Sequence, residues 1–514
     1  MLLRRFLHSH GLLLLNRSVR EATPFMRSIA ATRNPNFRHS ILAEGIAVTL
    51  LIALFFMWKS PYIAQQLVPV WDGNVYLLDA HDLLTGQQLY IWNYPLLVPG
   101  IVALVWSVMG ENYLPMRFLN LTFTLATAVA LYYSTRSEFG KIPSFLAAIL
   151  YLTSIEILIW SDQLAVYGPS SFFAVLALVT WRKHSYSASI AGAVFAALSC
   201  LARYSVVSIA FPIFIAFAIA NRKRPRLIVA AIFGACIPIL VYHLAFPFVL
   251  PRFLDIYLGY GFHSGNLTLP YYYYVANWHS FFGIIGVFGL LALFLPSTYR
   301  NDSSRAWAFW LIGSLVFFTI TLQKFDAYTF QWTPAVVYLS FMFLIKIKDT
   351  LLTHASQSRF EFLSERLSGS FNPKVFGTLL IFLVLLQSCT FASAYLQYER
   401  NAQPVFYRDN NLFAVADYLK THIPSNATFV TDYCAPALAY FSGRYGLQIW
   451  EHTNDTEYLD HLHGYMQSVD ARYVIIFPNL TGNSAKVLED SDFLILEDTL
   501  NVTVIGPVYV FHLT

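Results

Sequence analysis

The chain contains few charged residues for its length. Asp, Glu, Lys and Arg make up only 12% of its 514 residues, whereas 57% are hydrophobic and 17% are aromatic. An average soluble domain has about 25% charged and about 45–50% apolar residues. A chain with so little charge cannot bury all of its apolar surface against itself, which excludes a soluble enzyme, a disordered protein and a nucleic-acid-binding protein. The composition therefore indicates a protein that crosses a membrane several times.

Cysteine is also scarce, with four residues in the chain. Cys200, Cys236 and Cys389 fall in apolar runs, and only Cys434 lies in the more polar C-terminal part. A lone cysteine there predicts neither an intrachain disulfide framework nor a zinc site. The pair His461 and His463 is more typical of a polar surface than of a pair of metal ligands.

Long apolar runs dominate what is present. A spanning helix needs about 20 mostly apolar residues, because the hydrocarbon core is about 30 Å thick and a helix rises 1.5 Å per residue. The sequence predicts about eleven transmembrane helices, at residues 41–58, 117–134, 142–160, 169–182, 186–202, 205–220, 227–246, 279–296, 307–323, 328–345 and 375–395. A further run, residues 95–110, is short and contains Pro99 and Gly100, so it could be a short span or a helix in the membrane interface.

The positions of Lys and Arg decide between these two topologies, because cytoplasmic loops carry the excess of basic residues. With a cytoplasmic N-terminus and residues 95–110 on the outer surface, the basic segments 1–40, 222–226 and 346–374 all fall inside. The outer loops between spans then hold only five cations: Lys59, Arg117, Arg203, Arg252 and Lys324. One more crossing would place the clusters 222–226 and 346–374 outside. We therefore expect residues 95–110 to form an interfacial helix.

This topology divides the chain into a basic cytoplasmic segment, residues 1–40, a transmembrane domain, residues 41–395, and an extracytoplasmic domain, residues 396–514. The first outer loop, residues 59–116, is long. We expect a multi-pass protein of a plasma or inner membrane, in contact with membrane lipid, with its C-terminal domain outside. Four Asn-x-Ser/Thr sequons in that domain fit an exposed location: Asn426, Asn454, Asn479 and Asn501.

The C-terminal domain alternates two kinds of pattern. Residues 412–422 and 458–467 are helix-like, whereas 428–431, 473–477 and 502–510 are strand-like. This alternation predicts a small α/β module.

Carboxylates on the outer side are informative, because charge near lipid is costly. They are few: Asp72, Asp79, Asp82, Glu111, Asp162, Asp255 and Asp326. Asp72, Tyr76 and Asp79 follow a helical spacing and should share one face. Asp72 would lie at the N-cap of that helix, where a carboxylate can accept backbone N–H groups. The pattern alone leaves a capping role and a catalytic role of Asp72 equally open.

The surrounding motif consists of Asp72, Tyr76, Ala80, Leu83, Leu84 and Gly86, followed by Tyr94-Pro95-Leu96, Gly110 and Arg117. It resembles the first outer loop of the GT-C glycosyltransferases, specifically the family of protein O-mannosyltransferases and lipid A aminoarabinose transferases. The resemblance continues through short motifs at residues 191–192, 202–203, 324–334 and 440–444.

The resemblance implies a GT-C-like polytopic helical fold. It also implies an enzyme that moves a sugar from a polyprenyl-phosphate carrier to a lipid, glycan or protein acceptor on the outer side. Asp72 matches the catalytic aspartate and would accept the acceptor's proton, and direct displacement would invert the anomeric centre. Arg203 and Lys324 are the candidates for holding the donor phosphate. Both could instead reach toward lipid headgroups, which is the more favoured interpretation for Lys324.

We expect four residues to line the substrate groove: Tyr76, Tyr94, Arg117 and Tyr272. Tyr272 belongs to the run of tyrosines at 271–274. Sugars stack on aromatic faces, but such a run is more often an aromatic belt at the membrane interface.

Three positions depart from the family pattern. Gly73 replaces the second acid beside the aspartate, Tyr94 replaces the first proline of a Pro-Pro-Leu element, and Gly168 stands where a further acid is expected. Asp162, six residues before Gly168, is a candidate substitute as a second catalytic acid. With so few convergent ligands, no cofactor is expected with certainty, and a divalent metal ion is possible but doubtful.

Two other function classes remain open. A transporter or flippase of lipid-linked sugars should place ionisable groups near the middle of the membrane, but here the acids gather at one face. A catalytically silent relative that only binds glycolipid is consistent with Gly73.

Overall fold

The computed structural model describes residues 35–69, 72–87, 89, 95–247, 269–321, 324–357, 373–449, 456–483, 485–489 and 491–514. The chain divides into two compact units, residues 1–58 and residues 59–514. The described part of the first unit is helical and belongs to α2 (Pro35–Gln65). The second unit contains the other helices and a sheet. Most of the predicted basic segment 1–40 lies outside the described residues.

Each predicted span coincides with helical structure. The helices are α2, α6 (Leu119–Phe139), α7 (Lys141–Leu152), α8 (Ile155–Trp160), α9 (Tyr167–Trp181), α10 (Tyr186–Ala202), α11 (Val207–Ala220), α12 (Pro225–Ala245), α15 (Trp278–Ala292), α17 (Asp302–Ile320), α18 (Thr333–Gln357) and α20 (Pro373–His422). Five helical stretches among the described residues are long and apolar enough to cross a membrane: Leu42–Gln65, Tyr113–Phe139, Pro225–Ala245, Asp302–Ile320 and Val375–His422. Several other apolar helices are shorter. The protein is thus a multi-pass membrane protein by its helices, and the number of eleven crossings stays a prediction.

The run at 142–160 is not one helix. It breaks between α7 and α8, where Ser154 adopts an extended conformation (φ −63°, ψ 141°). The hydroxyl groups of Thr153 and Ser154 donate to the carbonyl oxygens four residues earlier, of Ile149 and Leu150. At Ser154 this bond replaces the helical backbone bond, because the Ser154 N–H bonds to the carbonyl oxygen of Tyr151 instead, and this explains a break that an apolar pattern could not predict.

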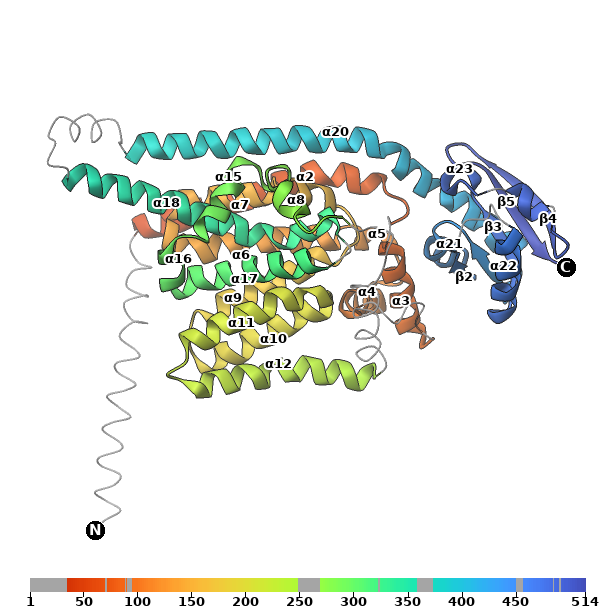
Figure 1. Ribbon diagram of the computed structural model, residues 1–514, viewed down its shortest axis with the longest axis horizontal. Helices are drawn as coiled ribbons and strands as arrows, with labels where there is room; N and C mark the ends of the chain where they lie inside the picture. The colour runs from red at the N-terminus through yellow and green to blue at the C-terminus, as the bar shows by residue number, and fades with distance from the viewer. Residues whose placement is uncertain are drawn as a thin grey trace, which may run out of the picture. The chain divides into compact units, whose positions relative to one another are not determined.

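The helices of the second unit pack side by side (Figure 1). Helix α10 packs between α9 and α12, α6 packs against α7 and α9, and α11 packs against α17. The α11–α17 contact is close at Gly313, where a Cβ atom would lie 2.2 Å from the carbonyl oxygen of Ser208. Only a residue without a side chain permits this approach.

The segment predicted to be the first outer loop contains three helices, α3 (Gly73–Thr85), α4 (Leu97–Met109) and α5 (Tyr113–Met116). Helix α4 confirms the helix predicted at residues 95–110, and its position at a membrane interface stays a prediction. The buried side chains of Val98, Val102 and Trp106 on α4 form one apolar cluster with Tyr76 and Leu77 on α3. This packing holds α3 in place.

The C-terminal region is an α/β module, as predicted. Its five strands are β1 (Thr428–Thr431), β2 (Tyr445–Gln448), β3 (Ala471–Ile476), β4 (Leu494–Val502) and β5 (Gly506–Leu513), in the order β2-β1-β3-β5-β4. β1 is parallel to β2 and β3, whereas β5 is antiparallel to β3 and β4. Its helices are α21 (Ala435–Ser442), α22 (Thr456–Ser468), α23 (Pro478–Thr481) and α24 (Ala485–Glu489).

The single strand predicted at 502–510 is wrong. This run contains the turn between β4 and β5, which ends at Gly506 with φ of +85°. Apolar residues on both sides of the turn produced the continuous strand-like pattern.

Helix α20 runs without interruption over 50 residues, through the boundary predicted at 395/396, and leads into the sheet (Figure 1). Arg444 covers its C-terminal end. The guanidinium donates from Nη2 to the carbonyl oxygen of Lys420 at 2.6 Å and from Nε to that of Ile423 at 2.9 Å. These bonds satisfy carbonyl groups that a helix end leaves without partners.

We expect Gly313→Leu to lower the thermal unfolding midpoint, because the new side chain would force α17 away from α11 at a cost of about 1–3 kcal/mol or more. Gly377→Leu on α20 is the matched control, since its Cβ would meet no atom within 4 Å. Thermal unfolding in detergent compares the two variants. Equal midpoints would contradict the close α11–α17 contact.

Candidate active site

Asp72 lies at the N-cap of α3 and is exposed. Its backbone carbonyl oxygen accepts the N–H of Tyr76 at 3.1 Å, as expected for the residue before a helix. Its side chain, however, makes no capping hydrogen bond to α3. The capping interpretation of this carboxylate therefore lacks the bond on which it depends.

Arg203 separates α10 from η1 (Tyr204–Val206), and its backbone is extended (φ −155°, ψ 117°). Its guanidinium carbon lies 4.5 Å from the ring centroids of both Tyr167 and Tyr328. Tyr167 begins α9, and Tyr328 belongs to η3 (Asp326–Gln331). Two aromatic faces thus fix the cation through cation–π contacts.

Asp72 and Arg203 share two electrostatic partners, Tyr167 and Tyr328. The charges of both side chains act on the phenol groups of Tyr167 and Tyr328. These four residues come from the start of α3, the start of α9, the end of α10 and η3, which are far apart in the sequence. A carboxylate and a cation with two common neighbours can serve as a base on one side of a reacting centre and as an anion-binding group on the other.

Lys324 lies four residues before Tyr328 and is buried. Its ammonium group donates to the carbonyl oxygen of Thr321 at 2.6 Å and lies 5.3 Å from the ring centroid of Tyr271. Burial lowers the pKa of Lys324. A bound anion would counter this effect, because it would stabilise the protonated form.

Tyr274 contacts the residue after Lys324 and also interacts with Arg203. Its hydroxyl group donates to the carbonyl oxygen of Phe325 and accepts the N–H of the same residue, both at 3.1 Å. It also interacts electrostatically with Arg203 and Tyr328. The predicted groove residue Tyr272 precedes α14 (Tyr273–Ala276) and is 68% exposed.

Asp162 takes part in a buried ion pair. Its Oδ2 atom lies 2.6 Å from Nζ of Lys59, and both side chains are fully buried. The Tyr395 hydroxyl group donates to the same oxygen at 2.9 Å, and Lys59 also donates to the carbonyl oxygen of Leu158 at 2.5 Å. This network accounts for the carboxylate structurally, and a catalytic role of Asp162 stays a prediction.

The other predicted groove residues have varied environments. Tyr76 is buried in the cluster between α3 and α4. Arg117 donates from Nη1 to the carbonyl oxygen of Ala64 at 3.1 Å and lies over the ring of Tyr113, 5.0 Å from its centroid. Tyr94 lies outside the described residues. Their contribution to a groove stays a prediction.

The two glycines that replace family acids are both tightly packed. A Cβ atom at Gly73 would lie 2.8 Å from Cβ of Pro69 and 3.0 Å from the carbonyl oxygen of Leu164. A Cβ atom at Gly168 would lie 2.4 Å from Oδ1 of Asn120, which accepts the Gly168 N–H at 2.7 Å. Neither position has room for an acidic side chain. Among the described residues, no three His, Cys, Asp or Glu side chains are grouped as metal ligands.

The C-terminal module lies against the helix that begins beside Asp72. Helix α21 packs on α3, and the ring of Tyr440 stacks on Trp106 with centroids 6.1 Å apart. Leu78 on α3 belongs to the main apolar cluster of the module, and Nδ2 of Asn74 lies 3.9 Å from Sγ of Cys434. The module therefore supports the element that carries the candidate base.

Sequence reasoning missed Tyr167, Tyr274 and Tyr328 as individual site residues, as well as the pairing of Lys59 with Asp162. Tyr167 and Tyr328 are two of 32 tyrosines, and no local spacing distinguishes them. The one available signal for Lys59 is its place in the apolar helix α2, which continues to Gln65 and calls for a partner of opposite charge.

We expect Lys59→Met to destabilise the protein by about 3–5 kcal/mol, because it leaves the Asp162 charge buried without its cation. The double variant Lys59→Met with Asp162→Asn should recover part of this loss. Thermal unfolding of the two variants and the wild type provides the measurement. A double variant as unstable as the single one would contradict the importance of the ion pair.

Comparisons with known proteins concern the family and the fold. Residues 93–252 match the family model of dolichyl-phosphate-mannose-protein mannosyltransferases. No match was found among curated proteins.

Solved structures share the fold at low sequence identity. ArnT from Cupriavidus metallidurans, bound to undecaprenyl phosphate, matches with a TM-score of 0.62 and 12% identity, over 90% of this chain and 97% of that one. The oligosaccharyltransferase AglB from Archaeoglobus fulgidus, in complex with an inhibitory peptide and a dolichol phosphate, matches with a TM-score of 0.54 and 11% identity, over 85% of this chain and 69% of that one. The resemblance predicted from the motifs is therefore confirmed, and the chain has the fold of the GT-C glycosyltransferases.

Proposed function

We propose that this protein is a membrane glycosyltransferase that moves a sugar from a polyprenyl-phosphate carrier to an acceptor on the extracytoplasmic side. The observation that carries the proposal is the common neighbourhood of Asp72 and Arg203 at Tyr167 and Tyr328. The fold of ArnT, which was solved with undecaprenyl phosphate, supports a carrier of this class.

In this reaction Asp72 acts as the base. Its carboxylate accepts the proton of the acceptor hydroxyl group while the hydroxyl oxygen attacks the anomeric carbon of the sugar. The bond from that carbon to the phosphate oxygen breaks, and its electron pair leaves with the phosphate. The products are the glycosylated acceptor and the polyprenyl phosphate, and a single displacement inverts the anomeric centre.

Arg203 and Lys324 bind the phosphate of the donor. The guanidinium of Arg203 is held between two rings before any substrate arrives, so little side-chain freedom is lost on binding. Lys324 loses its proton more readily than Arg203, because burial lowers the pKa of Lys324. An approaching anion would raise this pKa again.

The proposed location follows from the chemistry of the donor. A polyprenyl tail remains in lipid while its phosphate lies at the interface, so the site belongs at a membrane surface. We place it on the outer surface of a plasma or inner membrane, with the N-terminus of the protein inside. The C-terminal module, which packs on α3, takes part in acceptor binding on this side. The acceptor is a lipid, a glycan or a protein.

The test is sugar transfer by the purified protein in nanodiscs, with a panel of polyprenyl-phosphate sugars. Asp72→Asn should lower the release of polyprenyl phosphate by about 10²–10⁴-fold, since the base is lost. Asp417→Asn, which neutralises an exposed carboxylate on α20, is the matched control and should leave release unchanged.

Two results would overturn this function. Donor binding without release, in the wild type as well as the variant, would identify a catalytically silent glycolipid-binding relative. No donor binding in any arm would favour a transporter of lipid-linked sugars.

The role of Arg203 is tested by Arg203→Lys, which keeps the charge but loses the planar group between Tyr167 and Tyr328. We expect kcat/KM to fall about 10-fold, because both the stacking and the two-pronged phosphate contact are lost. Arg472→Lys, at an exposed arginine on β3, is the matched control. An unchanged kcat/KM in Arg203→Lys would remove Arg203 from the phosphate site.

A further inference from the structure

A second polar region lies at the other end of the same helices. Helix α9 runs 15 residues from Tyr167 to Trp181, and α10 returns over 17 residues to Arg203. At 1.5 Å per residue these helices are about 22–25 Å long. The loop between them is therefore about one helix length from the candidate active site.

Two loops meet in this region, residues 182–185 after α9 and residues 221–224 after α11. Nδ1 of His184 lies 3.1 Å from Oδ1 of Asn221, so the imidazole joins the two loops. His184 has a positive φ of 46°, an uncommon conformation for a residue with a side chain. This conformation and the hydrogen bond give the pair of loops a defined geometry.

The two loops carry a concentrated positive charge. Five exposed cations lie on them and on the first turn of α12: Lys183, Arg222, Lys223, Arg224 and Arg226. The sequence contains no Asp or Glu between Asp162 and Asp255, so no acid on α9 to α12 offsets them. Among the described residues, none of the five forms an ion pair, unlike Arg182, whose Nη2 lies 2.8 Å from Oε1 of Glu138.

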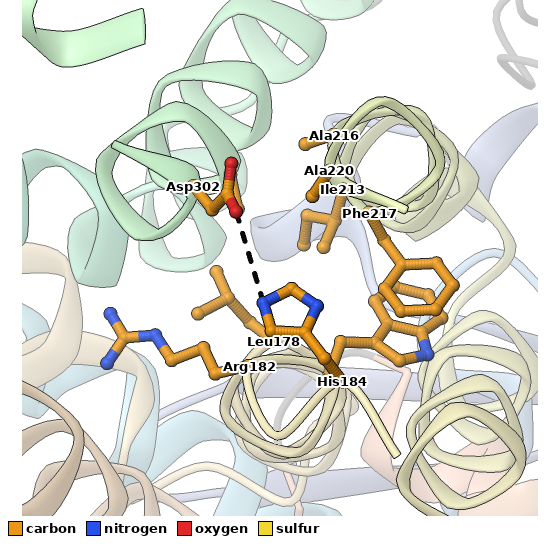
Figure 2. A pocket seen from close by; sticks show the side chains of 10 residues that line it. Leu178, Arg182, His184, Ile213, Ala216, Phe217, Ala220 and Asp302 are labelled. Atoms are coloured by element: carbon orange, nitrogen blue, oxygen red, sulfur yellow. Dashed lines mark ion pairs between the residues drawn. The ribbon is translucent and has the colours of Figure 1, made fainter. Parts of the chain in front are cut away.

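A pocket with an apolar wall opens beside these cations. Leu178 and Trp181 on α9 and Ile213 and Phe217 on α11 line one part of it. Figure 2 shows His184 and Asp302 facing each other across the pocket, with Nε2 and Oδ2 3.9 Å apart, and with Arg182 on the side away from Phe217. Asp302 is also paired with Arg305, so its charge is already compensated.

Exposed apolar side chains border the cations. Tyr186 on α10, Ile219 on α11 and Val229 and Phe233 on α12 are all between 40% and 64% exposed. Exposed apolar groups beside a row of Lys and Arg are typical of the level at which hydrocarbon meets headgroups. This placement favours a lipid over a soluble acidic partner.

We propose that the paired loops bind an anionic phospholipid. The headgroup phosphate lies among Arg222, Lys223 and Lys183, and the first part of an acyl chain enters the pocket against Ile213 and Phe217. The site is separate from the sugar-transfer site and does not depend on the proposed activity. It would couple the inner ends of α9 to α12 to the lipid composition of the membrane.

The test is native mass spectrometry of the full chain, released from mixed micelles that contain phosphatidylglycerol or phosphatidylcholine with identical acyl chains. The wild type should retain phosphatidylglycerol in preference to phosphatidylcholine. Arg222→Gln with Lys223→Gln should weaken phosphatidylglycerol binding roughly 30-fold, the factor expected for two cations near an anionic headgroup. Lys346→Gln with Lys348→Gln removes equal charge in the second half of α18 and should leave binding unchanged.

A second variant separates binding from any effect of loop charge on membrane insertion. Ala220→Phe narrows the pocket without changing charge, because Ala220 lines it. It should also weaken phosphatidylglycerol binding. Equal retention of the two lipids by the wild type, or unchanged retention in both pocket and loop variants, would overturn the proposal.

Discussion

The free-energy cost of removing a charge from water shapes most of what this structure does with its few ionisable groups. Three cations of the helical unit each meet a specific partner. Lys59 is paired with Asp162, Arg182 with Glu138, and Arg203 lies between two tyrosine rings. Each pairing joins segments that are distant in the sequence, so the same interactions that make burial tolerable also fix how the helices are arranged. The candidate active site is one such place, where the partners are aromatic and a phosphate would find the cation already oriented.

Much of the fold could be predicted from the sequence, because apolar runs report helices directly. Residues 186–202 were predicted with the bounds that α10 has, and residues 428–431 with those of β1. The failures lie where the pattern carries no information about local backbone bonds or turns. The hydroxyl group of Ser154 divides one apolar run into two helices, and a turn before Gly506 divides one strand-like run into two strands.

The candidate site was only partly predictable. Asp72 and Arg203 could be identified from the resemblance, because they occur within motifs. Tyr167 and Tyr328 could not, since their role arises from the return of η3 and α9 to the end of α10. Gly73 and Gly168, where the resemblance leads one to expect acids, show a related limit of prediction from sequence. The resemblance leads one to expect acids at these positions, but only the packing against Leu164 and Asn120 shows that an acidic side chain would not fit there.

Helix α20 gives the C-terminal module an unusual mechanical connection. Its 50 residues form a rod about 75 Å long, with Arg444 bonded across its last carbonyl groups. A module on a flexible linker could change its position to reach an acceptor. A module on a long helix moves together with that helix, because the helix transmits force and rotation along its axis. Pro404 is the interior position of this rod that lacks a backbone N–H, so bending should concentrate there. Under the proposed function, an acceptor would therefore have to diffuse to the module, and the range of acceptors would be limited by the reach of the acceptor itself.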